Sequence, residues 1–537
     1  MRVAAVQFAA GEDITANLAT CLRMIDAAAA EGADLIVLPE FCNHLSWYNS
    51  RETAHRRACT LDGGFLGAIA GRAARHGAYV KLNVTLAREN GRTTATSLLY
   101  GPDGSLLGHS DKLTLMGAEG DHMDPGEEPG PVIDTPIGRI GLYACMEGVT
   151  SDVCRDLTLR GAQLLLNSLN SFATDEASLH IPVRAAENKV WVVAANKVGP
   201  LLPEALTPAI AERLGVPPEQ VHGAGESQIV APDGTVVAKG PRSGEAVVVA
   251  DIDVSLADVK TRPDGTGILA MRRPELYRPI ASEPRERTAP PGAEGCRVAV
   301  VAADDPLPGV AEAAAAGAEL IVLPELAFGE TGRAEVAEAL AKALVGTGGY
   351  AVTSVRDGDA HAGLVVSAEG EAGVQLQLHR TERLPWVARL GSGVEVFELP
   401  FGRLALVVGD DSVVVEAFRL AAIADADVVA VPRAAGEDWE TSLGLPERSA
   451  ENRLNVVSAW TEGGLILDLT GDFTLWTAWE GPFTGRISHP IVTEAGHGVT
   501  VGTVHPAQAV NRLVSKNTDL VNGRAWRSLG TLKETAP

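Results

Sequence analysis

The chain has 537 residues, enough for two or more domains, and 46% of them are hydrophobic, which suffices for large buried cores. Its formal charge of -24 argues against a nucleic-acid partner, because binding phosphates requires clustered Lys and Arg. No apolar run approaches the roughly 18 residues that span a bilayer, and the N-terminus lacks a signal-peptide pattern, so we expect a cytoplasmic protein without membrane contact.

Strands and helices are predicted to alternate along the first half. Short apolar runs predict strands at 2–8, 35–38, 79–86, 96–100, 132–134, 139–144, 163–166, 190–195 and 246–252. Amphipathic runs predict helices at 14–31, 61–76, after residue 145 and from 182 to 188, and a Pro-rich insertion covers 200–221. This alternation predicts a layered α/β fold. The proline- and charge-rich stretch 281–295 has no periodicity and is expected to be a linker.

The second half of the sequence repeats the first. Three ordered pairs of segments match: 33–40 with 318–325, 136–140 with 400–404, and 184–190 with 448–454. The last two pairs share one offset of 264 residues. Ordered matches of this kind indicate a tandem repeat. We therefore expect a first domain over 1–280, a linker over 281–295 and a second, degenerate domain over 296–537.

Three side chains in the first copy suggest chemistry. Glu40 follows a buried strand, Lys112 has apolar neighbours, and Cys145 ends the apolar run 140–144. A cysteine at such a position more often packs in the core than reacts. However, the offset of 264 places Gly409 where Cys145 stands, and a structural requirement would tend to be shared by both copies. The loss of the thiol from the second copy favours a chemical role in the first.

Together these groups form a plausible set for acyl transfer. A thiol is mostly protonated at neutral pH and needs a base such as Glu40 before it can attack a carbonyl or nitrile. The tetrahedral intermediate needs a cation or N–H donors, each contributing about 3 to 4 kcal/mol, and Lys112 and the backbone N–H after Cys145 could supply them. The six cysteines have no metal-ligand spacing. This chemistry requires no metal and no organic cofactor.

At this point the sequence resembles the nitrilase superfamily, the carbon-nitrogen hydrolases that act on amides, N-carbamoyl groups and nitriles. The resemblance is strong over about 1–275 and weak over 296–537. It rests on six segments: Leu38-Pro39-Glu40-Phe41, Lys112-Leu113, Gly141 to Cys145, Arg184 to Asn188, Ala195 to Gly199, and Gly225 to Ile229 with Pro232-Asp233-Gly234.

The resemblance implies two four-layer α-β-β-α sandwiches in one chain. It assigns Glu40 as general base, Lys112 as oxyanion support and Cys145 as the nucleophile that forms a thioester. It also implies that Glu119 is an additional active-site glutamate and that the Met146 backbone N–H completes the oxyanion hole. Family members commonly pair two sandwiches, so the second copy would be a built-in partner in an intramolecular pseudo-dimer, with further homo-oligomerisation left open.

Three more residues are candidates for the pocket. Glu147 follows the nucleophile and would either face substrate or pair with a nearby cation. Trp47, on the loop after Glu40, would line the pocket or pack within its loop. Asn170, at the end of a strand, would contact substrate. The turn at Met146 to Gly148 matches neither the amidase nor the nitrilase pattern of the family, so it does not identify the branch.

The expected function is a cysteine-dependent amidase that hydrolyses an amide or N-carbamoyl bond of a small molecule. A nitrilase, acyl transfer to an amine and a non-catalytic scaffold are the alternatives. In the second copy, aligning His109 with His379 places Glu382 opposite Lys112, so the amine as well as the thiol would be lost. We expect that copy to be a pseudoenzyme.

Overall fold

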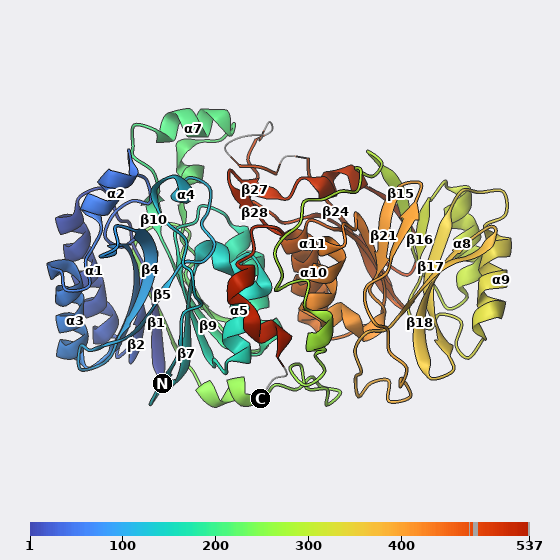
Figure 1. Cartoon of the computed structure of the whole chain (residues 1–537), viewed down its shortest axis with the longest axis horizontal. Coiled ribbons are helices and arrows are strands. Elements are labelled where there is room, and N and C mark those ends of the chain that lie inside the picture. The colour runs from blue at the N-terminus through green and yellow to red at the C-terminus, as the bar shows by residue number, and fades with distance from the viewer. Residues whose placement is uncertain (472, 476–478, 480–481, 535–537) are drawn as a thin grey trace.

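The protein consists of two sheet-rich halves of the same architecture, as Figure 1 shows. The structure is a computed structural model and describes residues 1–471, 473–475, 479 and 482–534. In each half, two six-stranded sheets pack face to face and helices cover both outer surfaces. The predicted pair of α-β-β-α sandwiches is confirmed. The end of the second predicted domain, residues 535–537, lies outside the described residues.

The first half builds each sheet from buried central strands and more exposed edge strands. The first sheet has the order β14-β1-β2-β3-β4-β5, and the second has the order β13-β12-β9-β8-β7-β6. Their bounds are β1 (Arg2–Gln7), β2 (Leu35–Val37), β3 (Tyr79–Ala87), β4 (Thr93–Tyr100), β5 (Leu106–Asp111), β6 (Val132–Thr135), β7 (Gly138–Ala144), β8 (Leu164–Leu169), β9 (Trp191–Asn196), β12 (Gln228–Val230), β13 (Val236–Lys239) and β14 (Ala246–Asp251). The central strands are parallel and largely apolar, as expected for strands covered on both faces.

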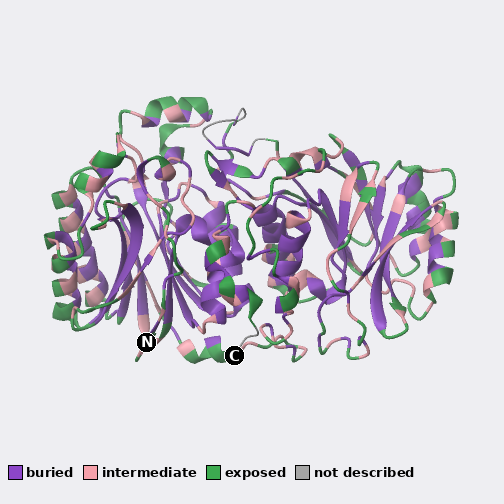
Figure 2. Ribbon diagram, in the orientation of Figure 1, coloured by how far each residue is buried: buried purple, intermediate pink, exposed green. Residues whose placement is uncertain are grey.

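Helices cover the outer face of each sheet in the first half. The helices α1 (Ile14–Ala30) and α3 (Gly64–His76) pack over the first sheet, and α5 (Ser151–Leu159) and α6 (Ile181–Asn188) over the second. Asp13 caps α1 by accepting the N–H groups of Thr15 and Ala16. Figure 2 shows that α1 and α3 keep one face exposed, whereas α6 is buried throughout and α5 is buried except at half-buried Val153. A helix buried on all sides must have a second packing partner.

The second half repeats this topology strand for strand. Its sheets have the orders β19-β18-β17-β16-β15-β26 and β20-β21-β22-β23-β24-β25. The strands are β15 (Cys296–Ala302), β16 (Leu320–Val322), β17 (Tyr350–Asp357), β18 (Ala360–Ser367), β19 (Gly370–Leu376), β20 (Val396–Leu399), β21 (Gly402–Leu406), β22 (Val428–Pro432), β23 (Asn455–Trp460), β24 (Gly463–Asp468), β25 (Ile491–Ala495) and β26 (Gly498–Val504). The helices are α8 (Pro306–Ala315), α9 (Arg333–Ala343), α10 (Val415–Ile423) and α11 (Leu445–Asn452).

The two halves meet through α5 and α6 on one side and α10 and α11 on the other, at the centre of Figure 1. Arg184 donates to Glu451 at 3.1 Å, and reciprocally Arg448 donates to Glu187 at 2.5 Å. The two arginines differ by 264 in number, as do the two glutamates. The contact is therefore self-complementary, like the interface of a twofold dimer.

A second reciprocal pair of contacts follows the same offset. Arg155 of α5 lies 3.5 Å from Glu416 of α10, and Arg419 of α10 lies 3.2 Å from Asp152 of α5. All four side chains are buried. Removing one member would leave a charge without its partner in a low-dielectric environment, which is strongly destabilising. The halves are therefore held in one fixed arrangement.

Each half also sends a hairpin into the other. Residues 260–268 leave the first half, and the Thr266 hydroxyl accepts the Glu382 backbone N–H at 2.8 Å. Residues 512–520 return from the second half, and the Thr518 hydroxyl accepts the Gly117 N–H at 2.8 Å. This returning hairpin carries β27 (Leu513–Ser515) and β28 (Thr518–Asp519).

Some local structure differs from the sequence expectation. The Pro-rich insertion 200–221 is not irregular throughout: it contains α7 (Thr207–Arg213) and is flanked by a small ribbon of β10 (Val198–Pro200) and β11 (His222–Ala224). Two further short helices, α2 (Arg51–Arg57) and α4 (Glu119–His122), were not predicted. Among the described residues, no helix has both the length and the apolar character needed to cross a bilayer.

Candidate active site

Glu40, Lys112 and Glu119 come together around one nitrogen atom in the first half. Lys112 Nζ donates to Glu40 Oε1 at 2.8 Å and lies 3.1 and 2.9 Å from the two oxygens of Glu119. All three side chains are buried. Glu119 is fixed further because it also accepts the Met116 backbone N–H at 2.8 Å. The structure thus gathers residues from the end of β2, from just after β5 and from α4.

Burial and neighbouring charges shift the pKa values of Glu40 and Lys112. Burial raises the pKa of Glu40 to about 7, with Lys112 opposing and Glu119 adding to the shift. Burial alone would lower the pKa of Lys112, but the carboxylates of Glu119 and Glu40 raise it well above its ordinary value. The amine therefore stays an ammonium at neutral pH. Glu40 keeps one oxygen, Oε2, without a hydrogen-bond partner among the described residues, so this atom is available to exchange a proton.

Cys145 sits at the tip of β7 in a strained backbone conformation. Its φ angle is 48°, in the left-handed region that non-glycine residues rarely occupy. Such strain persists where the surroundings enforce it, most often at functional sites. Burial and the charge of Glu40 raise the pKa of the thiol well above its usual value, while Lys112 opposes the shift. The thiol is thus neutral at rest, and it lies within the electrostatic influence of Glu40, whose pKa is near neutrality.

The backbone around the thiol is anchored by buried polar side chains. Asn167 at the end of β8 accepts the Cys145 N–H at 3.0 Å. Met146 is the second residue of the helical turn Cys145–Gly148, and the first N–H groups of a helix have no partner within it. The Met146 N–H is one of these first N–H groups, and its role as an oxyanion donor stays a prediction.

Glu147 does not face substrate. Its two carboxylate oxygens accept the backbone N–H groups of Leu113 and Ala144, both at 2.8 Å. Neither expected role of Glu147, a substrate contact or a cation pair, is seen among the described residues, since each oxygen accepts a backbone N–H. The side chain instead ties the segment that carries Lys112 to the strand that ends in Cys145.

Trp47 and Asn170 lie at the edge of this site. The Trp47 ring is half-buried and meets His122 edge-on, with ring centroids 5.8 Å apart. Asn170 donates to the Ser46 hydroxyl at 3.2 Å, and its carbonyl oxygen has no partner among the described residues. Both residues thus border the loop that follows Glu40.

Two buried lysines were not predicted as site residues. Lys81 donates to the Tyr143 carbonyl at 3.2 Å and to the Ser168 hydroxyl at 2.6 Å, which joins the two sheets behind the nucleophile. The Lys197 amine has no hydrogen-bond partner among the described residues and lies 5.8 Å from the Phe41 ring centroid. Burial lowers the pKa of Lys197 to about 8. The only sequence signal for either was a lysine within an apolar strand or just after one.

The second half contributes one wall of the site. A buried apolar cluster joins Met146 and Val149 to residues from the far half, namely Phe473, Leu475, Trp479, Phe483, Ile487, Val514 and Leu520. On the same side, the Thr518 hydroxyl contacts both the Gly117 N–H and the Leu115 carbonyl. The loop that carries Glu119 is therefore held by the hairpin 512–520.

The corresponding place in the second half is filled by other groups. The Gln377 N–H bonds to a carbonyl of β18 just as the Lys112 N–H bonds to a carbonyl of β4. The registers of the two strand pairs therefore align Gln377 with Lys112. The expected alignment of Glu382 with Lys112 is therefore wrong, because the loop after β19 does not have the same length as the loop after β5. The cation comes instead from Arg383, which forms a two-pronged ion pair with Glu325.

Gly409 retains the backbone of the nucleophile without its side chain. Its φ is 56°, close to that of Cys145. A Cβ atom added there would lie 2.8 Å from Glu325 Oε2 and 2.8 Å from the His361 ring. The neighbouring Asp410 accepts from Arg383 at 2.8 Å. This half therefore keeps the shape of the turn but has neither thiol nor room for one.

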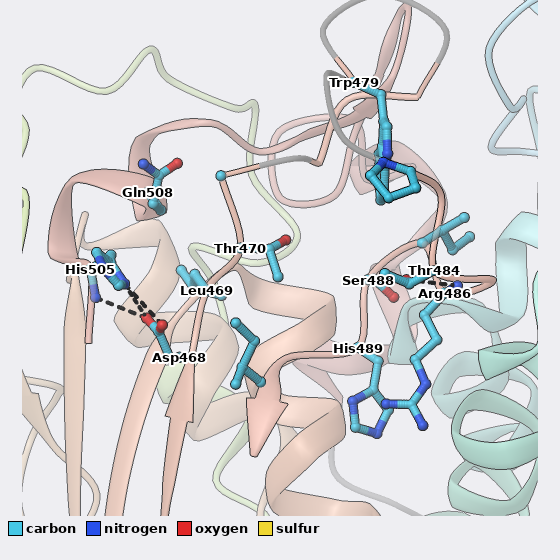
Figure 3. Close-up of a pocket in the computed structure, with 14 residues that line it drawn as sticks. Asp468, Leu469, Thr470, Trp479, Thr484, Arg486, Ser488, His489, His505 and Gln508 are labelled. Carbon is cyan, nitrogen blue, oxygen red and sulfur yellow. Dashed lines mark hydrogen bonds and ion pairs between the residues drawn. The ribbon is translucent and has the colours of Figure 1, made fainter. Parts of the chain in front are cut away.

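An open cavity in the second half lies apart from the predicted site residues. One cavity of about 560 Å³, drawn in Figure 3, is lined by residues of the second half, and there His505 is already paired with Asp468 at 2.9 Å. None of the predicted site residues lines it. Among the described residues, no group of three or more His, Cys, Asp or Glu side chains is arranged to hold a metal ion.

The first half of the chain is similar to known carbon-nitrogen hydrolases. Relatives include a nitrilase from Pyrococcus abyssi, 27% identical over 49% of this chain and 92% of its own length. Another is N-carbamoylputrescine amidase from Arabidopsis thaliana, 26% identical over 51% of this chain and 93% of its own length. The crystal structure of an amidase from Nesterenkonia sp. aligns with 52% of this chain and 95% of its own, at 23% identity and a TM-score of 0.40. Residues 2–261 match the carbon-nitrogen hydrolase family. The first half of this chain thus belongs to the carbon-nitrogen hydrolases of the nitrilase superfamily.

Proposed function

We propose that the first half is a cysteine-dependent amidase that hydrolyses an amide or N-carbamoyl C–N bond of a small molecule through a thioester. The observation that carries the proposal is the free Oε2 of Glu40, whose pKa is about 7, next to a permanent ammonium and the Cys145 thiol. A base with a pKa near the working pH can both take and return a proton. The similarity to amidases, such as the one from Arabidopsis thaliana, supports the same reaction class.

In the proposed acylation, Glu40 removes the thiol proton and the Cys145 sulfur attacks the carbonyl carbon. The carbonyl oxygen becomes an oxyanion, which the Lys112 ammonium and the Met146 N–H stabilise, at about 3 kcal/mol or more per donor. Glu40 then passes its proton to the leaving nitrogen as the C–N bond breaks. Ammonia or an amine departs and a thioester remains.

Deacylation reverses these roles with water as the nucleophile. Glu40 takes a proton from water, hydroxide adds to the thioester carbon, and the same donors stabilise the second oxyanion. The C–S bond breaks, the carboxylic acid leaves, and the proton on Glu40 returns to the sulfur. Glu119 keeps Lys112 charged and in place throughout.

The second half is proposed to be a non-catalytic partner within the chain. Gly409 replaces the nucleophile, Gln377 stands where Lys112 would be, and Arg383 neutralises Glu325. Its proposed contribution to catalysis is structural, through the hairpin 512–520 and the apolar wall against Met146.

Product analysis tests this proposal. The purified chain is assayed against short primary amides, their N-carbamoyl amine analogues and the matching nitriles, with ammonia and acid quantified. We expect acid and ammonia from amides, loss of turnover in Cys145→Ala and Glu40→Gln, and full turnover in Cys154→Ala as a matched control at another buried cysteine. Turnover of nitriles with amides left untouched would instead assign a nitrilase. Hydroxamate formation with added hydroxylamine would reveal the acyl-enzyme.

A further inference from the structure

One buried carboxylate beside the active site keeps an oxygen without a hydrogen-bond partner among the described residues. Glu176 begins the π-helical turn Glu176–His180, shortly after β8, and is 2% exposed. Its Oε2 makes no hydrogen bond, and no ion pair to the side chain is found within the part of the chain that is described. Burying a carboxylate without a partner is costly, so such groups are normally paired.

Glu176 interacts electrostatically with the catalytic groups. It contributes to the raised pKa of the Cys145 thiol, and the Glu40 carboxylate in turn acts on Glu176, whose own pKa is raised to about 8, chiefly by burial. Glu176 therefore lies within electrostatic reach of the nucleophile. The adjacent segment also borders open space: Thr174 lines a cavity of about 370 Å³ together with Gly485 from the second half.

Neighbouring charged groups are already committed elsewhere. Asp175 accepts the backbone N–H groups of Ile487 and Ser488, each at 2.9 Å. The His180 ring bonds to Glu447 at 2.8 Å and to the Ser488 hydroxyl at 3.0 Å. Neither side chain supplies a direct partner for Glu176.

The equivalent carboxylate in the second half is paired with cations. Glu440, 264 residues later, begins an equivalent π-helical turn, Glu440–Gly444. It pairs with two guanidinium groups: Arg433 at 2.9 Å and Arg262 at 2.8 Å. The same backbone position thus holds a carboxylate with two cations in one half and a bare carboxylate in the other.

Both cations have apolar counterparts in the first half. The carbonyl of Arg433 accepts the Glu325 N–H just as the carbonyl of Leu169 accepts the Glu40 N–H, so Leu169 occupies the position of Arg433. Arg262 belongs to the hairpin 260–268, and its equivalent in the hairpin 512–520 is Val514. Leu169 and Val514 are fully buried. The first half therefore keeps the carboxylate, Glu176, but has apolar side chains at the positions of both arginines.

We propose that Glu176 binds a cationic nitrogen group of the substrate, an ammonium or a guanidinium, at the opposite end from the C–N bond that is cleaved. The substrate class is then an amide or N-carbamoyl compound that also carries an organic cation. The inference rests on the proposed amidase function for its substrate, but its binding component can be tested without turnover. Leu169 and Val514 would pack on the methylene groups that precede the cation.

A matched pair of substrates tests the selectivity. The two compounds are 5-aminopentanamide and hexanamide, which have the same shape but differ by an ammonium in place of a methyl group. Because a hydrogen bond to a charged group is stronger than a neutral one, we expect kcat/KM to favour 5-aminopentanamide by about 10- to 100-fold. Glu176→Gln should reduce this ratio to about 1, whereas Glu440→Gln should leave it intact. Equal loss on both substrates would overturn the proposal.

Direct binding separates this inference from the proposed function. Calorimetry on full-length Cys145→Ala compares n-butylammonium and n-butylguanidinium with n-butanol. We expect at least one cation to bind about 10-fold or more tightly than the alcohol, and that advantage to vanish when Glu176→Gln or Glu176→Met is added. Cation binding without amide cleavage would refute the amidase and keep the site. Amide cleavage with no cation advantage in either assay would refute the site and keep the amidase.

Discussion

The clearest electrostatic prediction concerns Glu119 and the pH dependence of the reaction. Glu40 must be ionised to take the thiol proton, so kcat/KM should rise as pH increases through about 7, the pKa of Glu40. The charge of Glu119 helps to raise that pKa. Replacing Glu119 by Gln removes the charge and lets the full attraction of Lys112 act on Glu40. The pKa of Glu40 should fall, and the acidic limb of the profile should move to lower pH.

The size of this shift follows from the geometry. Both carboxylates lie within 2.9 Å of Lys112 Nζ, so their bound oxygens can be no more than about 5.8 Å apart. Two charges at that distance interact by about 3 kcal/mol at an effective dielectric constant of 20. That energy corresponds to about 2 pKa units. Relaxation of the site reduces it, so we expect a shift of about 1 to 2 units, together with a lower maximal rate because Lys112 loses a positioning contact.

The assay is the pH profile of kcat/KM between pH 5 and 9 for one amide, measured on the parent chain and on Glu119→Gln. The matched control is Glu128→Gln, an exposed glutamate on the same loop, which should leave the limb in place. A limb that stays at its original pH, or moves upward, in Glu119→Gln would refute the assignment of Glu40 as the titrating base.

Three further predictions concern the relation between the halves. Thr518→Val removes both hydrogen bonds to the loop at Gly117. It should lower kcat about 3- to 10-fold in steady-state kinetics and reduce the free energy of unfolding by about 1 to 2 kcal/mol. An unchanged kcat would mean that the hairpin has no role in catalysis. Gly409→Cys in a Cys145→Ala background should show no turnover in the same amide assay, because the new Cβ meets Glu325; measurable turnover would contradict a closed second site. Arg448→Ala removes one of the two buried arginines that pair with Glu187 and Glu451 and should cost about 3 to 5 kcal/mol in chemical unfolding. A loss below about 1 kcal/mol would mean that the interface pairs contribute little.

Much of the fold could be predicted from local sequence patterns. Buried parallel strands produce short continuous apolar runs, and the run at 35–38 ends two residues before Glu40, while β2 ends three residues before it. The same reasoning placed Cys145 at a strand end. The repeat offset of 264 also held through the π-helical turns and the turn at Gly409, because the chain between those points has no insertion.

Other features depend on contacts between distant segments and left no local signal. The contacts of Glu147 depend on N–H groups from two separate segments, the loop after β5 and the end of β7, so its sequence position near the nucleophile was misleading. The crossing of the hairpins 260–268 and 512–520 follows from the twofold arrangement of the halves, not from either hairpin alone. The missing partner of Glu176 became visible only when Glu440 supplied a comparison.

The most direct test of the central claim is the number and location of acyl groups that the chain accepts. Rapid mixing with p-nitrophenyl acetate, followed by acid quench, intact-mass measurement and peptide mapping, gives both values. We predict a burst of one p-nitrophenolate per chain and one acetyl group on the peptide that contains Cys145, with no burst in Cys145→Ala. Acetylation of another cysteine, a label in the second half, or a burst that survives Cys145→Ala would contradict the account.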